Sequence, residues 1–326
     1  MTEQIIKELG YGMIGTVYKV KYNNKYYAMK IEHILDTDKI KDIKSPIWRE
    51  NDFVENIASK YKDQFVQMYE YKFIDDCTHI QKYSLDVNKI NEYSKNKITK
   101  LAASTTCIKR YYELLDGSIQ NLIPTLNQQQ IYSFIIQLAY IINILETNGY
   151  VHGDFHVGNI GYLKTKKKYI YCDKIKVPTF GYIFKAIDLG SVLHERYMLS
   201  NSDKLKYNSL FKKELYKPYM TTLIDFENFW QYVDKNNIKI DYKHINNFKE
   251  WNMSKSLNDM FTNITYKHKL NLLRILFPEQ TQKLLLGNKF NKTLPPTLYI
   301  NTIDIIFMYK CNFDSKKIFD YFIKQL

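Results

Sequence analysis

The 326-residue chain is 45% hydrophobic and 25% charged, a composition that is ordinary for globular proteins and argues against intrinsic disorder. Lys and Arg outnumber Asp and Glu by 47 to 34, a formal net charge of +13, which favours anionic partners such as nucleotide phosphates, nucleic acid, acidic protein segments or a membrane surface. The length suffices for one large domain or two modest lobes.

Three glycines near the start, Gly10, Gly12 and Gly15, form a G-x-G-x-x-G pattern. Apolar and polar residues alternate through 18–28, across an Asn-Asn pair, which predicts a strand hairpin rather than a helix. Glycines between two strands are typical of a flap over nucleotide phosphates, whereas a dinucleotide fold places them between a strand and a helix. A simple tight turn is the alternative.

The second strand of this hairpin ends in Lys30, 15 positions (30 − 15) after the last glycine. Such a lysine is either a solvated edge charge or a ligand of the α and β phosphates of a nucleotide. A helix is predicted from about Pro46, because Ser45 suits the N-cap and proline suits the first helical position. Two acids on this helix, Glu50 and Glu55, could reach Lys30, and we favour Glu50.

Strand periodicity predicts a strand pair at 65–74 and 106–115. The polar, lysine-rich stretch 75–104 between them is interpreted as an excursion on the surface. Strand periodicity ends at an Asp-Gly turn, after which helical periodicity begins. We therefore expect two lobes, 1–115 and 116–326.

A core helix is predicted from Asn127, because apolar residues follow at helical spacing as far as Gly149. This helix leads into the segment HGDFHVGN. There, Asp154 could face a substrate hydroxyl while the amide oxygen of Asn159 reaches a divalent cation. In isolation, an Asp and an Asn in a loop are ordinary turn residues, so this hypothesis depends on the other motifs of the chain.

The order of these motifs resembles the eukaryotic-like protein kinase family. The motifs are Gly10, Gly12, Gly15, Lys30, Glu50, Asp154, Asn159 and Asp188-Leu189-Gly190. The segment 112–122 is similar to the hinge and following helix of casein-kinase-1-like and vaccinia-related kinases, and 177–190 more loosely to kinases of nucleocytoplasmic large DNA viruses. The resemblance implies an α+β, bilobal protein-kinase-like fold with a small antiparallel β-rich N-lobe and a larger, mainly helical C-lobe.

The resemblance also implies a role for each residue. The residues that would bind ATP are Gly10, Gly12, Gly15, Val17, Ala28, Lys30, Glu50 and Glu113. Asp188 would bind the Mg²⁺ ion that bridges the β and γ phosphates, and Asn159 the second ion. Asp154 would orient the attacking hydroxyl and accept its proton, with Lys30 and His156 completing the catalytic set. The predicted function is an ATP- and Mg²⁺-dependent kinase acting on Ser or Thr of a protein substrate.

Two residues beside Asp154 depart from the family pattern. Gly153 stands where many kinases have arginine, so we expect activity that does not depend on activation-loop phosphorylation. His156 stands where Ser/Thr kinases place a lysine that touches the γ phosphate. The pattern H-G-D-x-H also resembles aminoglycoside and choline phosphotransferases, which makes a small-molecule phosphotransferase the first alternative; a non-catalytic kinase-fold scaffold is the second. His152 is expected to be a packed residue rather than one of a cluster of metal ligands.

The stretch 164–182 is expected to form a basic β excursion. Its charged run 164–168 is either a solvated turn or a docking surface for an acidic protein substrate or nucleic acid. An Ala-Pro-Glu motif is not apparent after Asp188, and Asp225 is either the family's next characteristic acid or an N-cap. Further helices, the last at 302–325, would pack in the C-lobe.

The four cysteines lie far apart in the sequence and form no C-x-x-C pair. This spacing argues against both a zinc site and a disulfide framework, and favours a reducing compartment. The N-terminus lacks the pattern of a secretory signal, and the longest apolar run, 131–145, falls short of a membrane span. We therefore expect an intracellular, cytoplasmic protein without a transmembrane segment, located in the host cytoplasm or the virion if the chain is viral.

Overall fold

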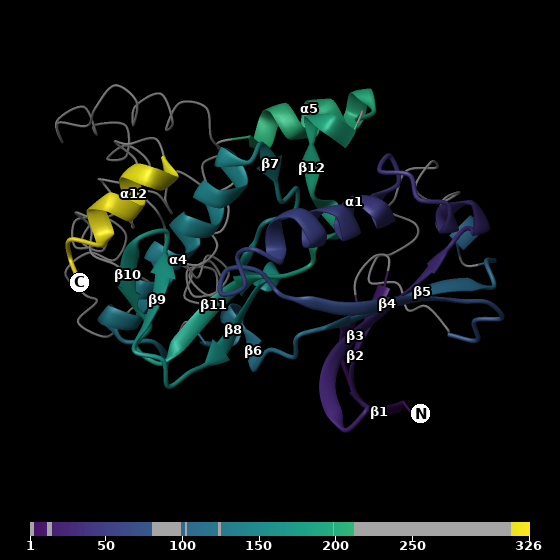
Figure 1. The fold of residues 1–326 in the computed structure, drawn as a ribbon, viewed down its shortest axis with the longest axis horizontal. Coiled ribbons are helices and arrows are strands. Elements are labelled where there is room, and N and C mark those ends of the chain that lie inside the picture. The colour runs from purple at the N-terminus through teal and green to yellow at the C-terminus, as the bar shows by residue number, and fades with distance from the viewer. Residues whose placement is uncertain are drawn as a thin grey trace, which may run out of the picture.

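The computed structural model describes residues 3–11, 15–79, 99–101, 103–122, 125–197, 199–211 and 314–326. Within them the fold is mixed α+β, with an antiparallel N-terminal sheet followed by a region of helices and short strands (Figure 1). The sheet has the strand order β1-β2-β3-β5-β4. Its strands are β1 Gln4–Tyr11, β2 Gly15–Tyr22, β3 Lys25–Ile34, β4 Met68–Ile74 and β5 Thr106–Tyr112.

The predicted hairpin is formed by β2 and β3, which pair in one continuous antiparallel register. Its turn consists of Asn23 and Asn24, with φ angles of 50° and 60°. Two successive left-handed residues match the right-handed twist of a tight hairpin, and asparagine adopts this conformation more readily than most residues. The asparagine pair therefore fixes the register that places Val17 opposite Lys30.

The N-terminal sheet has two chemically different faces, because successive side chains of a strand point to opposite sides. One face, which we call the outer face, holds a small apolar core. Its buried members are Val20, Met29, Ile31, Cys107 and Tyr111. The other, the inner face, carries Lys30, Glu32 and Arg110, whose side chains meet Glu50 of helix α1 Pro46–Phe53.

Helix α1 begins at Pro46 after Ser45, as predicted, although the Ser45 hydroxyl donates to Asp38 Oδ1 at 3.2 Å rather than accepting from the helix. The helix continues into a π-helical turn, Val54–Ala58. Several apolar residues of this segment are buried, and these are Trp48, Phe53, Val54, Ile57 and Ala58.

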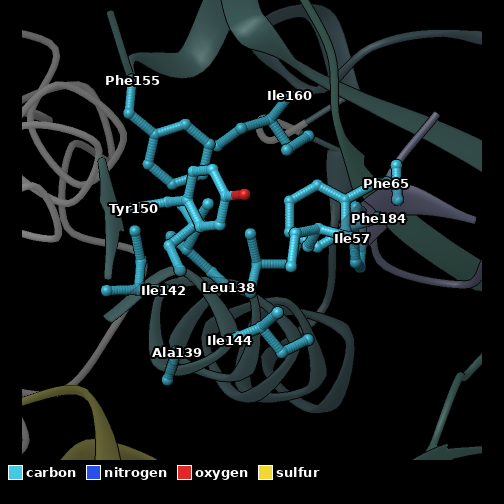
Figure 2. Close-up of a cluster of buried hydrophobic side chains, with 14 of the residues drawn as sticks. Ile57, Phe65, Leu138, Ala139, Ile142, Ile144, Tyr150, Phe155, Ile160 and Phe184 are labelled. Atoms are coloured by element: carbon cyan, nitrogen blue, oxygen red, sulfur yellow. The ribbon is translucent and has the colours of Figure 1, made fainter. Parts of the chain in front are cut away.

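Helix α4 Gln128–Thr147 is the centre of the larger core, and its side chains meet those of surrounding strands and loops (Figure 2). Its N-cap is the predicted Asn127, which accepts from the backbone N–H of Gln130 at 3.0 Å in a capping box. The other elements of this region are β6 Gly117–Ser118, α3 Ile119–Leu122, β7 Tyr150–Val151, β8 Ile160–Lys164, β11 Tyr182–Ala186, β12 Leu193–His194, α5 Asn201–Leu210 and α12 Ser315–Phe322.

The predicted basic excursion is a hairpin of β9 Tyr169–Cys172 and β10 Ile175–Pro178. It is fixed to α4, because the Ser133 hydroxyl donates to the Pro178 carbonyl at 2.6 Å and the Asp173 N–H donates to the Tyr140 hydroxyl at 2.7 Å. The hairpin is therefore an integral part of the fold with one buried face.

The expectation that no disulfide is present is wrong, because Cys77 and Cys107 are bonded. Antiparallel pairing of β4 and β5 sets Ile74 opposite Cys107, so the chain leaving β4 passes beside this cysteine. A separation of 30 residues along the sequence thus becomes a Cα–Cα distance of 5.7 Å. The cysteine argument for a reducing compartment fails with it.

Some predictions lie outside the described residues. These concern Gly12, most of 75–104, Asp225 and the helices expected between 225 and 314. Within the part of the chain that the structure describes, no helix is both long enough and apolar enough to cross a membrane.

Candidate active site

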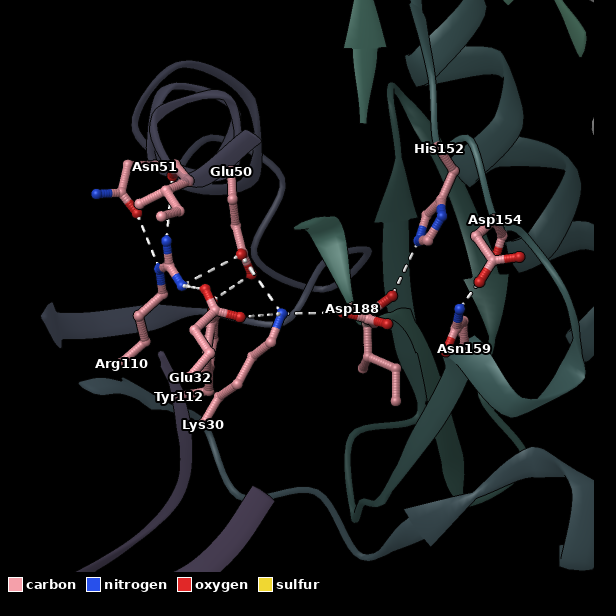
Figure 3. A network of polar contacts seen from close by, with 12 residues as sticks. Lys30, Glu32, Glu50, Asn51, Arg110, Tyr112, His152, Asp154, Asn159 and Asp188 are labelled. Atoms are coloured by element: carbon pink, nitrogen blue, oxygen red, sulfur yellow. Dashed lines mark hydrogen bonds and ion pairs between the residues drawn. The ribbon is translucent and has the colours of Figure 1, made fainter. Parts of the chain in front are cut away.

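Lys30 lies at the centre of a cluster of carboxylates on the inner face of the sheet (Figure 3). Its Nζ is 3.1 Å from Asp188 Oδ1, 3.5 Å from Glu50 Oε2 and 3.6 Å from Glu32 Oε2. These acids come from three separate places: the segment after β11, helix α1, and β3 itself. The lysine predicted as a phosphate ligand is thus surrounded by negative charge.

The charges of this cluster reinforce one another. Burial opposes the charged form of Lys30, but Glu50, Asp188 and Glu32 outweigh it and raise the pKa of the ammonium well above its ordinary value. The Lys30 ammonium lowers the pKa of Asp188 against the opposing effect of burial. Burial likewise opposes ionisation of Glu32, yet Lys30 and Arg110 lower its pKa. Lys30, Glu32 and Asp188 are therefore ionised at neutral pH.

Arg110 is a second cation of the cluster and is completely buried. It forms ion pairs with Glu32 and, at 3.5 Å, with Glu50 Oε2. Its Nε donates to Asn51 Oδ1 and its NH2 group to the Ile47 carbonyl, both at 3.1 Å. Arg110 thus joins β5 to helix α1. We call the side chains of Lys30, Glu32, Glu50 and Arg110 the inner-face network.

Glu50 rather than Glu55 is the helix acid that contacts Lys30. Glu50 is buried and its Oε1 accepts a hydrogen bond of 2.5 Å from the hydroxyl of Tyr112, whereas Glu55 is exposed and lies 4.0 Å from Lys41. Sequence reasoning anticipated the acid but missed Arg110 and Tyr112. The available signal was an arginine in a strand that, apart from Lys109, consists of β-branched, aromatic and cysteine residues.

The loop between β7 and β8 holds its polar residues through the backbone. His152 is fully buried and its Nε2 lies 2.9 Å from the Ile187 carbonyl, which accepts its proton. Burial lowers the pKa of His152, so the ring is neutral and packed, as predicted. The Asn159 amide nitrogen donates to the Asp154 carbonyl at 2.8 Å. That bond commits the nitrogen to the loop, so the amide oxygen is the atom that Asn159 can offer to a cation.

Asp154 is half-exposed and faces His156, with Oδ2 3.6 Å from Nε2. The other ring nitrogen, Nδ1, is 3.0 Å from the backbone N–H of Gly158. Because Nδ1 accepts this bond, the proton of a neutral His156 ring is on Nε2, on the side of Asp154. The structure therefore brings the predicted base and the unusual histidine together.

Gly153 in this loop and Gly190 in the segment after β11 lie where other groups approach the backbone closely. Gly153 has a φ of +81°, and a Cβ there would lie 2.1 Å from the carbonyl oxygen of Ser191. An arginine at this position is therefore excluded by the backbone, which explains the departure from the family pattern. A Cβ on Gly190 would lie 3.3 Å from both Lys30 Nζ and Glu50 Oε2.

Ile187 links the two halves of the site through its backbone. Its N–H donates to the Asn159 carbonyl at 3.0 Å, and its carbonyl accepts from His152. Asp188 follows immediately, with a left-handed φ of 55°. This geometry explains how the loop carrying Asp154 and the acid facing Lys30 are held as neighbours.

The remaining predicted nucleotide ligands lie on the sheet or beside it. Val17 pairs with Lys30 across the hairpin, and Ala28 is on the same strand as Lys30. Gly15 begins β2, where a Cβ would lie 3.1 Å from the Ile31 carbonyl oxygen. Gly10 is near the end of β1. The register sets Gly10 opposite Val17 and Val17 opposite Lys30, so these three residues lie side by side across β1, β2 and β3.

Glu113 was predicted to bind ATP, and in the structure it forms an ion pair with Lys185. Both of its carboxylate oxygens accept hydrogen bonds from the buried Lys185 Nζ of β11, at 2.7 and 2.9 Å, and its N–H donates to the Gln67 carbonyl. Lys185 also donates to the Lys62 carbonyl at 2.6 Å. Sequence reasoning missed this ion pair, which joins the segment after β5 to the strand that leads to Asp188.

The comparisons with known proteins agree with a kinase-like relationship. No protein-family model matches the chain. Over 177 residues, the chain is 28% identical to a protein of Acanthamoeba polyphaga mimivirus named "Putative serine/threonine-protein kinase L670". The match covers 54% of this chain and 25% of the mimivirus protein, so the similarity spans about a quarter of that relative's length.

Proposed function

We propose that the protein is a kinase that transfers the γ-phosphate of ATP to a serine or threonine hydroxyl of a protein substrate. The observation that carries the proposal is the position of Lys30, held between Glu50 and Asp188 at 3.5 and 3.1 Å. A cation fixed between a helix acid and a second acid beside the Asp154 loop is the arrangement that phosphoryl transfer requires for binding phosphates and metal. We further propose that the chain forms two lobes, divided near 115.

Each side chain then has a role that its geometry supports. Lys30 binds the α and β phosphates, and Glu50 orients it from helix α1. Asp188 and the amide oxygen of Asn159 suit Mg²⁺, a hard cation that prefers oxygen ligands. Bound Mg²⁺ would neutralise charge on the phosphates. Asp154, half-exposed in the loop, orients the acceptor hydroxyl and takes its proton.

The paired His156 supports a second candidate, a small-molecule phosphotransferase on the same scaffold. Its Nε2–H faces Asp154 at 3.6 Å, whereas a lysine would present a permanent charge on a longer stem. For a protein acceptor, the exposed lysines of the β9–β10 hairpin offer a docking surface for acidic segments. These are Lys166, Lys167, Lys168, Lys174 and Lys176.

The function is tested by incubating the purified chain with γ-labelled ATP and Mg²⁺. Acceptors are casein, a basic protein and small aminoalcohols, each offered also to Asp154→Ala. Asp173→Asn is the matched control, because Asp173 is exposed and left-handed in the β9–β10 turn, a conformation that asparagine tolerates. We expect label on protein Ser or Thr, lost in Asp154→Ala and kept in the control. Label on aminoalcohols alone would select the second candidate, and equal label from Asp154→Ala would reject the assigned base.

A further inference from the structure

The outer face of the N-terminal sheet carries a group of side chains unrelated to the inner-face network. His33 of β3, Cys77 after β4 and Cys107 of β5 present ligand atoms that all lie within 4.8 Å of one another. We propose that, when the Cys77–Cys107 disulfide is reduced, these three residues bind one zinc ion. The metal and the disulfide are then alternative cross-links at the same place.

The distances suit tetrahedral zinc. Cys107 Sγ lies 3.6 Å from His33 Nδ1, and Zn–S and Zn–N bonds of usual length place such a pair of ligand atoms about 3.6 Å apart. Two zinc-bound thiolates lie about 3.8 Å apart. The Cα atoms of Cys77 and Cys107 are 5.7 Å apart, so rotation of the two side chains opens the disulfide to this distance while the strands stay in place.

The contacts of His33 make Nδ1 its metal-binding atom under the proposal, because Nδ1 faces Cys107 and Nε2 faces a backbone carbonyl. Its Nε2 lies 2.7 Å from the His79 carbonyl oxygen, and its Nδ1 lies 2.9 Å from the Ser104 carbonyl oxygen. A neutral imidazole has a single N–H, so one of these contacts sets a nitrogen lone pair against a carbonyl oxygen. An Nε2–H bonded to a backbone carbonyl is the usual outer-shell contact of a metal-binding histidine. Under the proposal, the Ser104 carbonyl must therefore turn away from Nδ1 to make room for the ion.

His79 lies beside this group, although its ring nitrogens are not among the ligand atoms that lie within 4.8 Å of one another. Its ring stacks on that of His33 with a centroid distance of 6.0 Å and an interplanar angle of 23°. Its Nε2 is buried and, among the described residues, has no hydrogen-bond partner. Buried polar atoms are almost always paired, and under the proposal a shift of this ring toward the cysteines would complete a Cys₂His₂ set.

The two states are linked by a balanced exchange. A thiol reductant supplies two electrons and two protons, the Cys77–Cys107 bond breaks, and the reductant is released as its own disulfide. Binding of Zn²⁺ to the two cysteines then displaces the two thiol protons, leaving two thiolates on the ion. Reduction under this proposal replaces one cross-link between β5 and the chain after β4 by another.

The test compares the same chain in both states, which avoids relying on a variant. Wild type is reduced with a thiol, freed of thiol and metal by anaerobic gel filtration, and titrated with Zn²⁺ and, separately, with Co²⁺. We expect one equivalent of tightly bound zinc, and Co²⁺ bands of thiolate charge transfer and tetrahedral coordination. The oxidised chain, with its disulfide intact, should show neither. A reduced chain that binds no stoichiometric metal overturns the proposal.

Variants assign the ligands. Cys77 is half-buried, so Cys77→Ser tests the site without disturbing the core, and its fold is checked by circular dichroism of the metal-free chain. We expect loss of the stoichiometric zinc and of the Co²⁺ charge-transfer band. Cys172→Ser is the matched control, because Cys172 is a buried free thiol in β9, away from this sheet. Bands that persist in Cys77→Ser, or vanish in Cys172→Ser, contradict the assignment.

Discussion

The inner-face network and the loop around Asp154 form one candidate site but are held in different ways. In the network, buried charged side chains hold one another: Arg110 and Lys30 share Glu32 and Glu50. In the loop, the backbone holds the side chains, through carbonyls and N–H groups. Its acid Asp154 is half-exposed.

Because of this difference, we expect substitutions in the network to change mainly the free energy of unfolding and substitution of Asp154 to change mainly the chemistry. Removing one member of a buried ion network leaves an uncompensated charge in the interior, which costs folding free energy. A half-exposed acid in a loop held by its backbone contributes little to folding, so its removal changes chemistry alone. The four predictions below test this separation.

The largest effect is expected for Asp154→Asn under the proposed function. Turnover should fall on the order of 10³-fold, because the amide can neither orient the hydroxyl as a carboxylate does nor accept its proton. The free energy of unfolding should change by less than about 0.5 kcal/mol. Phosphate transfer and urea denaturation measure the two quantities, with Asp173→Asn as control. A large loss of stability would break the comparison.

Arg110→Met is expected to act in the opposite manner. It leaves Glu32 and Glu50 short of a buried partner, and should lower the free energy of unfolding by about 3–5 kcal/mol. The same substitution at Arg196, whose side chain is 41% exposed in its pair with Asp52, should cost no more than about 1 kcal/mol. Urea denaturation of both variants checks this, and equal losses would contradict a special role of the buried network.

Gly153→Ala tests whether the loop backbone itself is under steric control. A Cβ would meet the Ser191 carbonyl at a left-handed φ, and we expect a loss of about 2–3 kcal/mol. Gly181→Ala shares the left-handed φ, at +93°, but its Cβ would meet no described atom within 4 Å, so about 1 kcal/mol is expected. Thermal melting of the pair isolates the contact with Ser191.

The smallest effect concerns the pH dependence of the Lys30–Asp188 pair. The pKa of Asp188 is lower in the folded chain, so its contribution is present above the unfolded value of about 3.9 and lost as pH falls through the folded value. Asp188→Asn should therefore be less stable than wild type by under about 1 kcal/mol from pH 7 to about 5. This difference should shrink below about pH 4, as followed by urea denaturation. A difference that grows towards acid pH would contradict the assignment.

Much of the local structure was predictable because single residues determine it. The asparagine turn, the proline at the start of α1 and the Asn127 cap each specify one boundary. The hairpin register then carries Lys30 to a known place on the sheet. The predicted contact of Lys30 with Glu50 is present in the structure. The chemical roles assigned to the site residues stay predictions.

Contacts between strands distant in sequence were not predictable in the same way. Cys77 meets Cys107 only through the register of β4 and β5, and Lys185 meets Glu113 only because β11 passes beside the end of β5. No local pattern encodes these distances, since they depend on which strands become neighbours. Arg110 was equally hidden, because its partners come from β3 and α1.

The side-chain contacts of the site, together with the backbone between them, form a closed ring. Starting at the lysine, the ring passes through Lys30, Glu50, Tyr112, Glu113, Lys185 and Asp188, alternating between side-chain bonds and short lengths of backbone. A closed ring resists rotation of the sheet against β11 more than an open chain of the same bonds does. Its most solvated link is Lys30–Asp188, where the acid is 51% exposed. We therefore expect this link to open first if the sheet moves against β11, at the place proposed for the phosphates.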